Sequence, residues 1–307
     1  MADRVSFGRA WGHRLALLAA GLTLPLLFMG GLVTTKGVGL IVPDWPTTFG
    51  ENMFLFPWSK MVGGVFYEHS HRLLGAAVGL VTLVLAVWLW LRETRRWVRF
   101  LGIAAFLLVV IQGVLGGLRV VLADPTLALV HACLAQAFFA LASALATVTS
   151  RGWQESHARE CSDEAEKIRR LGILTTALIY AQIVLGALLR HTGSYLEAHL
   201  IVAALVVAHV VWLIRRILRS GADRKLARAA GALGVALAVQ LGLGLGAYLK
   251  FFPGTIPYAA LEWLITSHVL GGAMLLVSAL SVTLWSYRVL APAEKIAPAL
   301  AVEQVGG

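Results

Sequence analysis

The chain has 307 residues, of which 59% are hydrophobic and 14% are charged, and its formal net charge is +10. Its mean hydropathy of +0.79 excludes an ordinary soluble protein and favours a polytopic membrane protein. The two cysteines, Cys133 and Cys161, fall in an apolar block and in a polar segment, so we expect no disulfide framework.

Eight apolar blocks follow one another along the chain, and each is close to the length of about 20 residues that a bilayer-crossing helix needs. The segment 35–65 contains prolines, glycines and aromatic residues, which predict an ordered surface structure near the membrane interface and not a ninth span. We expect the first block to be an uncleaved anchor, because no small-residue cleavage site follows it. The blocks cover residues 14–34, 72–91, 99–119, 127–149, 171–190, 196–214, 229–249 and 263–287.

The basic residues are divided unequally between the two sides of the predicted membrane. With the N-terminus inside, 20 of the 26 lysines and arginines fall on the inner side. This split predicts a multi-pass protein of the bacterial inner membrane with both termini in the cytoplasm. The positive charge is then an orientation signal, so the expected surroundings are a lipid bilayer and nucleic acid is excluded as a partner.

The chain contains an internal repeat. The offset from His71 to His199 is 128 residues, and the offset from Gln112 to Gln240 is also 128. Two four-helix bundles with the same helix order account for this spacing, and they predict an all-α fold. The expected units are an N-terminal bundle at 1–150 that includes the outer loop 35–65, a cytoplasmic linker at 151–170, a C-terminal bundle at 171–290 and a cytoplasmic tail at 291–307.

Four histidines lie within one to two turns of the predicted outer ends of the even-numbered blocks. Neutral imidazole ligates haem iron, and facing helices of a bundle can present two imidazoles to one haem. One intramembrane histidine alone is more often a hydrogen-bonded interior residue, but four at equivalent places indicate a site. Zinc or copper is the alternative, although no cysteine, methionine or carboxylate cluster completes such a site in both halves. The four are His71, His131, His199 and His268.

Glu68 lies three residues before His71, so the two share a helix face. A carboxylate beside a haem can accept protons or stabilise developing positive charge. The second half has Leu196 three residues before His199, and this difference predicts that one site does chemistry while the other carries electrons. The alternative is that Glu68 forms an ion pair with Arg72 at the membrane edge.

Basic residues also end the odd-numbered blocks on the outer side. Arg119 and Arg190 can pair there with haem propionates, because guanidinium groups bind carboxylates well. The alternative is that their side chains extend to the membrane interface without a specific partner.

Several motifs resemble one known family over nearly the whole chain, from about residue 12 to residue 290. They are "GGLVTTKGVGLIVPDWP", "EHSHRLLG", "QGVLGGLRV" with "LVHACLAQ", "QIVLGALLRHTG" with "EAHL", and "SHVLGG". The chain resembles the haem A synthase family on these motifs.

The resemblance implies an oxidoreductase that converts a methyl group of haem O to a formyl group by successive hydroxylations, for cytochrome oxidase biogenesis. It implies a haem b cofactor between His199 and His268 and a substrate haem between His71 and His131, both near the extracytoplasmic face. Glu68 then matches the family's acid. The implied partners are haem O, haem O synthase and an electron acceptor, and a homo-oligomer is compatible with this interpretation.

One departure and two alternatives accompany the resemblance. Some family members carry a cysteine pair in the first outer loop, whereas residues 35–65 contain none, so a thiol relay is not expected there. The same ligands would also suit a di-haem b electron carrier, such as a quinone-linked subunit. A haem chaperone or transporter without turnover is the other alternative.

Overall fold

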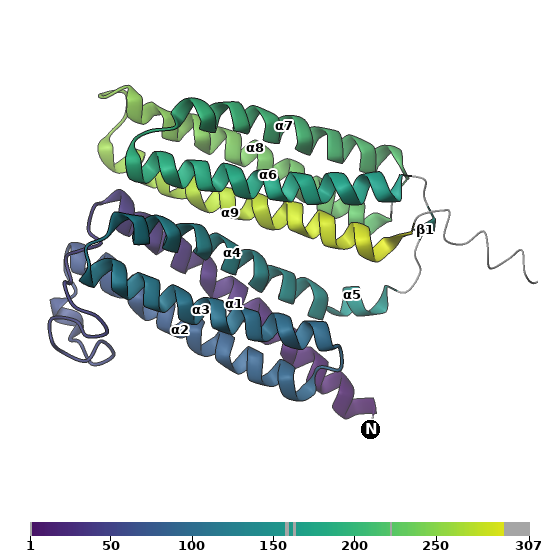
Figure 1. The fold of residues 1–307 in the computed structure, drawn as a ribbon, viewed down its shortest axis with the longest axis horizontal. Coiled ribbons are helices and arrows are strands. Elements are labelled where there is room, and N and C mark those ends of the chain that lie inside the picture. Colours follow the sequence, from purple (N-terminus) through teal and green to yellow (C-terminus); the bar gives the residue numbers. More distant parts are fainter. Residues whose placement is uncertain (1, 157–159, 162–163, 222, 292–307) are drawn as a thin grey trace, which may run out of the picture.

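A computed structural model describes residues 2–156, 160–161, 164–221 and 223–291 of the chain, with side chains described for 10–156, 164–221 and 223–291 (Figure 1). The long helices are α1 (Ala2–Thr35), α2 (Gly64–Arg92), α3 (Arg96–Val121), α4 (Pro125–Thr149), α6 (Ala165–Thr192), α7 (Leu196–Arg219), α8 (Arg224–Tyr248) and α9 (Tyr258–Val289). The short elements are α5 (Arg151–Glu155), the 3-10 turns η1 (Trp58–Lys60) and η2 (Leu249–Phe251), and the paired strands β1 (Glu160–Cys161) and β2 (Leu290–Ala291).

Eight of these helices are long and apolar enough to cross a membrane, which confirms the prediction of an eight-helix all-α protein. The segment between α1 and α2 forms no further long helix, as expected, and holds only η1 and one isolated bridge. Figure 1 shows the N-terminal end of α1 and the C-terminal end of α9 at one end of the molecule and the loop between α1 and α2 at the other. These are called the basic end and the loop end below.

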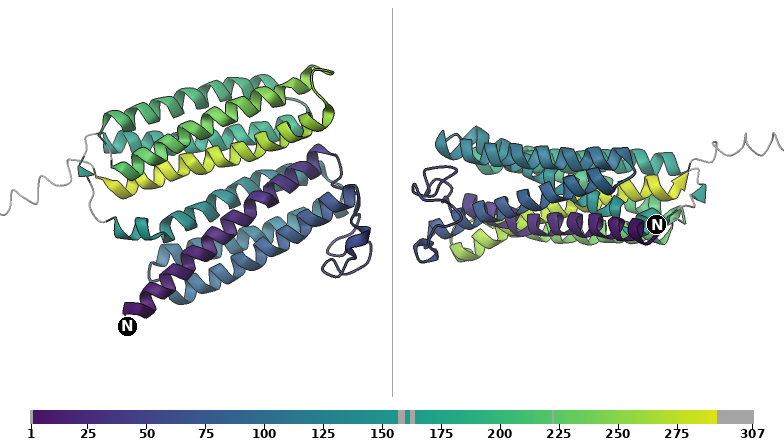
Figure 2. Two further views of the ribbon diagram at one scale, coloured as in Figure 1. Left: turned by 180° about the vertical axis from the view of Figure 1, so that it is seen from behind. Right: turned by 90° about the horizontal axis from the view of Figure 1, so that it is seen from below.

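The helices associate in two groups that follow the chain order. Helices α1 to α4 pack with one another, as do α6 to α9, and the two groups meet where α1 and α4 contact α9 (Figure 2). The similarity in sequence between the two groups, and the domain boundaries drawn from it, stay predictions. The predicted tail at 291–307 lies outside the described residues except for Ala291.

All the long helices except α7 begin earlier than their apolar blocks. Helix α2 begins at Gly64 and not at residue 72, α6 at Ala165 and not at 171, and α9 at Tyr258 and not at 263. Apolar blocks mark the lipid-facing part of a helix, whereas its backbone hydrogen bonds continue into polar sequence at the interface. As a result His268 lies ten residues into α9, deeper than the one to two turns expected.

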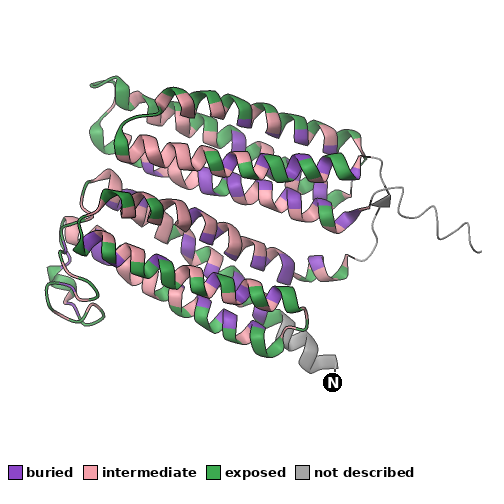
Figure 3. Cartoon of the chain, in the orientation of Figure 1, coloured by how far each residue is buried: buried purple, intermediate pink, exposed green. Residues whose placement is uncertain are grey.

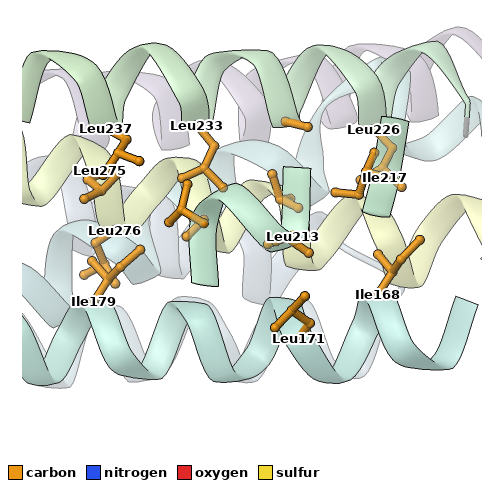
Figure 4. Close-up of a cluster of buried hydrophobic side chains, with 14 of the residues drawn as sticks. Ile168, Leu171, Ile179, Leu213, Ile217, Leu226, Leu233, Leu237, Leu275 and Leu276 are labelled. Carbon is orange, nitrogen blue, oxygen red and sulfur yellow. The ribbon is translucent and has the colours of Figure 1, made fainter. Parts of the chain in front are cut away.

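The hydrophobic core of each bundle fills only the basic end. In the second bundle it runs from Ile168 to Ile179 on α6 and from Leu226 to Leu237 on α8 (Figure 4). In the first bundle it includes Leu85 on α2 and Leu145 on α4, and it stops before the loop end (Figure 3). The half of each bundle nearest the loops therefore lacks a closely packed aliphatic core, and this half carries the four histidines.

The start of α4 is fixed by a local cap. Pro125 occupies the first turn, where its missing N–H is not needed, and the Asp124 carboxylate accepts hydrogen bonds from the amides of Thr126 and Leu127 at 2.7 and 3.3 Å. Asp124 lies seven residues before His131, so this cap sets where that imidazole enters the bundle.

Replacing Asp124 with alanine removes the acceptor for both amides and is expected to destabilise the fold by about 1 kcal/mol. Thermal unfolding in detergent, followed by helical circular dichroism, measures the change. Asp124→Asn keeps a capping oxygen and serves as the control. Equal unfolding temperatures for Asp124→Ala and the unsubstituted protein would contradict the cap.

Candidate functional site

The structure brings His71 and His131 together at the loop end of the first bundle. Their ring centroids are 6.4 Å apart and their planes are inclined by 85°. Each ring lies against a glycine of the preceding helix: a Cβ atom at Gly30 would be 2.8 Å from Cε1 of His71, and one at Gly116 would be 3.2 Å from Cε1 of His131. A side chain at Gly30 would force the His71 ring to move, and one at Gly116 would press on the His131 ring.

The second bundle repeats this arrangement with His199 and His268. Their centroids are also 6.4 Å apart, with an interplanar angle of 75°. A Cβ atom at Gly186 or Gly244 would be 3.0 Å from Cε1 of the neighbouring imidazole. The reason for these glycines becomes visible only once the helices lie side by side.

The separation within each pair suits two axial ligands of one metal centre. A metal–imidazole bond is about 2 Å long and the ring centroid lies about 1 Å farther away, so two opposed ligand rings stand about 6 Å apart. A zinc or copper ion would need further protein ligands, and the described residues contain no group of three or more histidines, cysteines and carboxylates that could hold one. A metal that brings its own in-plane ligands, as haem iron does, needs only the two imidazoles.

Glutamine side chains hold two of the four histidine segments. The Gln112 side chain donates to the backbone carbonyl of His131 at 3.0 Å, and the Gln182 side chain donates to that of His199 at 2.9 Å. His71 differs, because its Nδ1 lies 3.2 Å from the carbonyl oxygen of Leu26. Buried polar atoms without a partner among the described residues gather here, including Nδ1 of His131 and of His268 and Oε1 of Gln112, Gln182 and Gln240. Such atoms mark a place prepared for a further polar or coordinating group.

Glu68 is buried, with 2% of its surface exposed, and both carboxylate oxygens are engaged. Oε1 accepts a hydrogen bond from Arg72 at 2.7 Å, and Oε2 accepts one from the backbone amide of Val42 at 3.0 Å. The ion pair that the sequence left as an alternative is therefore present. The ion pair holds the Glu68 carboxylate next to Val42, in the loop between α1 and α2.

Arg72 and His69 extend this attachment of the loop. Arg72 donates to the carbonyl oxygens of Val42, Asp44 and Thr47, and Nδ1 of His69 lies 3.1 Å from the Thr48 hydroxyl. Of the two histidines in "EHSHR", His71 lies beside His131 inside the bundle, whereas His69 contacts the loop. The side chains of this motif are thus divided between the bundle and the loop.

Asp44 organises the loop itself. Its carboxylate accepts hydrogen bonds from the Thr47 hydroxyl and from the amides of Phe49 and Gly50. Burial alone would raise the pKa of Asp44, but these hydrogen bonds outweigh burial and hold the pKa below its usual value. The carboxylate is therefore ionised at neutral pH and keeps the turn closed.

The loop between α1 and α2 packs against α3 close to the first histidine pair, and the connection between α6 and α7 has no loop of comparable length. The Trp45 indole lies against Gly117, where a Cβ atom would be 2.2 Å from its ring, and Gly117 is the neighbour of the glycine that contacts His131. Arg119 donates to the carbonyl oxygen of Gly39 at 3.0 Å. In the second bundle α6 and α7 are joined by residues 193–195 alone.

Arg190 connects the two bundles. It donates to the carbonyl oxygen of Gly31 and to the Thr35 hydroxyl, both at 2.6 Å. The Thr35 hydroxyl also lies 3.1 Å from that of Thr266, two residues before His268. Arg119 and Arg190 thus lie at the loop end, as predicted, and both donate to the protein backbone there.

The family model of the cytochrome oxidase assembly proteins matches residues 13–198. The chain is similar to proteins named heme A synthase. It is 29% identical over 192 residues to the one from Shouchella clausii (60% of either chain) and 31% identical over 184 residues to the one from Halalkalibacterium halodurans (56% of either chain). A third, from Exiguobacterium sp. AT1b, is 26% identical over 271 residues, which are 78% of this chain and 86% of that one.

The chain spans about three fifths of the length of the first two relatives. The matched segment of the family model covers more than half of the chain, from α1 into the first turn of α7, and includes His71 and His131 with the loop that covers them. The eight apolar helices together with this match identify a multi-pass membrane protein that belongs to the cytochrome oxidase assembly protein family.

Proposed function

We propose that the chain is a haem A synthase, which oxidises a methyl group of haem O to a formyl group by successive hydroxylations. The observation that carries this proposal is the presence of two imidazole pairs with ring centroids 6.4 Å apart, of which only the first lies in the bundle that holds the long loop between α1 and α2. Two histidine pairs of similar geometry would supply two haem sites. The different surroundings of the pairs favour a substrate role for one site and a cofactor role for the other. The names of the similar proteins agree with this assignment.

The substrate site is the first bundle. His71 and His131 would hold the iron of haem O, and Trp45 would narrow the site on the outer side through its contact with Gly117. The glycines behind the imidazoles limit where the two rings can lie.

The second bundle is the cofactor site, where His199 and His268 hold haem b. When bound there, haem b supplies one-electron redox chemistry. Converting a methyl group to a formyl group also adds one oxygen atom. With water as the source of that atom the reaction releases four electrons and four protons, so an electron acceptor must complete it. Helix α1 links the two sites, because Gly30 lies against His71 while its neighbour Gly31 lies against Thr266 on the helix of His268.

Glu68 acts in the first bundle as a fixed negative charge. Arg72 and the Val42 amide each donate a hydrogen bond to one of its oxygens. Glu68 could accept a proton from the substrate only if one of these hydrogen bonds, which attach the loop, were broken. Stabilising positive charge that develops on the substrate requires no such rearrangement. Of the two roles that the sequence allowed, charge stabilisation therefore fits these contacts better.

The setting proposed for this reaction is the bacterial inner membrane, with both termini in the cytoplasm and both haem sites near the outer face. The even number of spans brings both chain ends to the basic end, in agreement with the distribution of lysine and arginine. Haem O synthase is the expected source of substrate, and Arg119 and Arg190 are the expected contacts of the haem propionates.

The proposal is tested by producing the protein together with a haem O synthase and separating the extracted haems by chromatography. Haem A is expected to form. A di-haem electron carrier or a haem chaperone would bind haem and yield no haem A, and that outcome would exclude a synthase.

Single substitutions of the ligands distinguish the two sites. His199→Ala is expected to lose the haem b that copurifies with the protein, whereas His71→Ala keeps it and forms no haem A, because each variant removes one of two axial ligands in one bundle. Pyridine haemochrome spectra and haem chromatography give the two readouts. The reverse pattern would exchange the substrate and cofactor halves.

Glu68→Gln removes the negative charge and keeps the shape of the side chain. It is expected to lower haem A formation about 100-fold while bound haem b is unchanged, since the effect is confined to charge stabilisation in the first bundle. Glu262→Gln is the matched control, because Glu262 is a buried carboxylate at the loop end that is paired with Lys36. Equal haem A yields from Glu68→Gln and the unsubstituted protein would remove Glu68 from the mechanism.

Gly117→Ala tests the cover of the first site. The added methyl group occupies the position of the Trp45 ring, so the indole must move and the loop opens. Haem A formation is expected to fall at least tenfold with haem b retained. Gly113→Ala, on the same helix with open space around its position, is the control and is expected to keep full activity.

A further inference from the structure

A groove of about 490 Å³ lies at the basic end of the second bundle, along the outer side of α7. It is far from the histidine pairs, because its lining on α7 comes from the C-terminal half of the helix whereas His199 lies in the first turn. Figure 1 shows α7 at the edge of the molecule, away from the first bundle. The groove therefore opens on a surface that faces the membrane.

The residues of the groove form one stripe along α7. Ala208, Trp212, Arg215 and Arg219 follow one another at intervals of four, three and four residues, which places them on one helix face. The stripe is apolar toward the middle of the span and basic toward its end, and Arg219 is the last residue of the membrane-spanning segment. The side chain of Trp212 is 53% exposed at the boundary between the two parts.

The arginines of the groove are not equivalent. Arg216 is neutralised, because it donates to the Glu164 carboxylate at 2.5 Å and also lies over the Trp212 ring at 5.6 Å. Arg215 and Arg219 are exposed and form no ion pair with any described residue. Two unneutralised guanidinium groups, one helical turn apart, therefore face the lipid headgroup level and can bind a phosphate between them.

We propose that this groove binds one anionic phospholipid, with its phosphate between Arg215 and Arg219 and an acyl chain along Ala208, Val211 and Trp212. The basic part alone would suit any phosphate. The apolar part is continuous with the membrane-facing surface of α7, where Leu205 and Val211 are also exposed, and this continuity selects a lipid over a soluble anion. The site is independent of the haem sites.

The test uses the purified full chain in nanodiscs of phosphatidylcholine to which phosphatidylglycerol is added, with bound lipid counted by native mass spectrometry. The unsubstituted protein is expected to retain one phosphatidylglycerol. Arg215→Gln/Arg219→Gln is expected to bind it about 30-fold more weakly, from the loss of two basic residues at the headgroup level. Arg92→Gln/Arg96→Gln removes two exposed arginines from the basic end of the first bundle and is the matched control.

The outcomes separate a specific site from general attraction. An equal loss of lipid in the Arg92→Gln/Arg96→Gln control would overturn the proposal, because any arginine near the surface would then do the same. Inorganic phosphate is the second probe: if it displaces the lipid at equal concentration, the groove is an anion site and the proposal fails. Trp212→Ala is expected to weaken lipid binding while phosphate binding stays unchanged, and a failure to weaken it would exclude the acyl-chain contact.

Discussion

Close contact between a glycine of one helix and an imidazole of the next is the constraint on which the rest of this protein depends. It occurs four times, at Gly30, Gly116, Gly186 and Gly244, and in every case a methyl group on the glycine would press on the ring. Because the glycine fixes where each ring can lie, opposite rings face each other at one common distance in both bundles.

The distribution of apolar packing explains why the site can exist inside a helical bundle. Leucine, isoleucine and valine fill the basic end of both bundles, and this packing aligns the helices. At the loop end the helices continue in the same directions but carry glycines, histidines and glutamines in place of large aliphatic side chains. The contacts of α1 and α4 with α9 hold the two bundles together.

The difference between the bundles lies in one short polar motif. "EHSHR" directs His71 inward and uses Glu68, His69 and Arg72 to hold the loop that follows α1. The second bundle has His199 at the corresponding place, but residues 193–195 alone join α6 to α7 there. The two bundles thus carry histidine pairs of like geometry and differ in the segments attached to their outer surface. The cofactor and substrate roles proposed for the halves follow from that difference.

The sequence by itself determined the number of spans and the all-α class, and it singled out four histidines as candidate site residues. Apolar length and residue type are local properties of a membrane chain, so they can be read without the fold. It placed the starts of α2, α6 and α9 too late, since hydropathy does not follow a helix into polar sequence. Only the tertiary structure decided that Gly30 backs His71, that Trp45 lies over Gly117 and that the Glu68 carboxylate is shared between Arg72 and the loop. These contacts join residues on different helices or in a loop, and their distances depend on how the bundles pack, which no local pattern in the sequence contains.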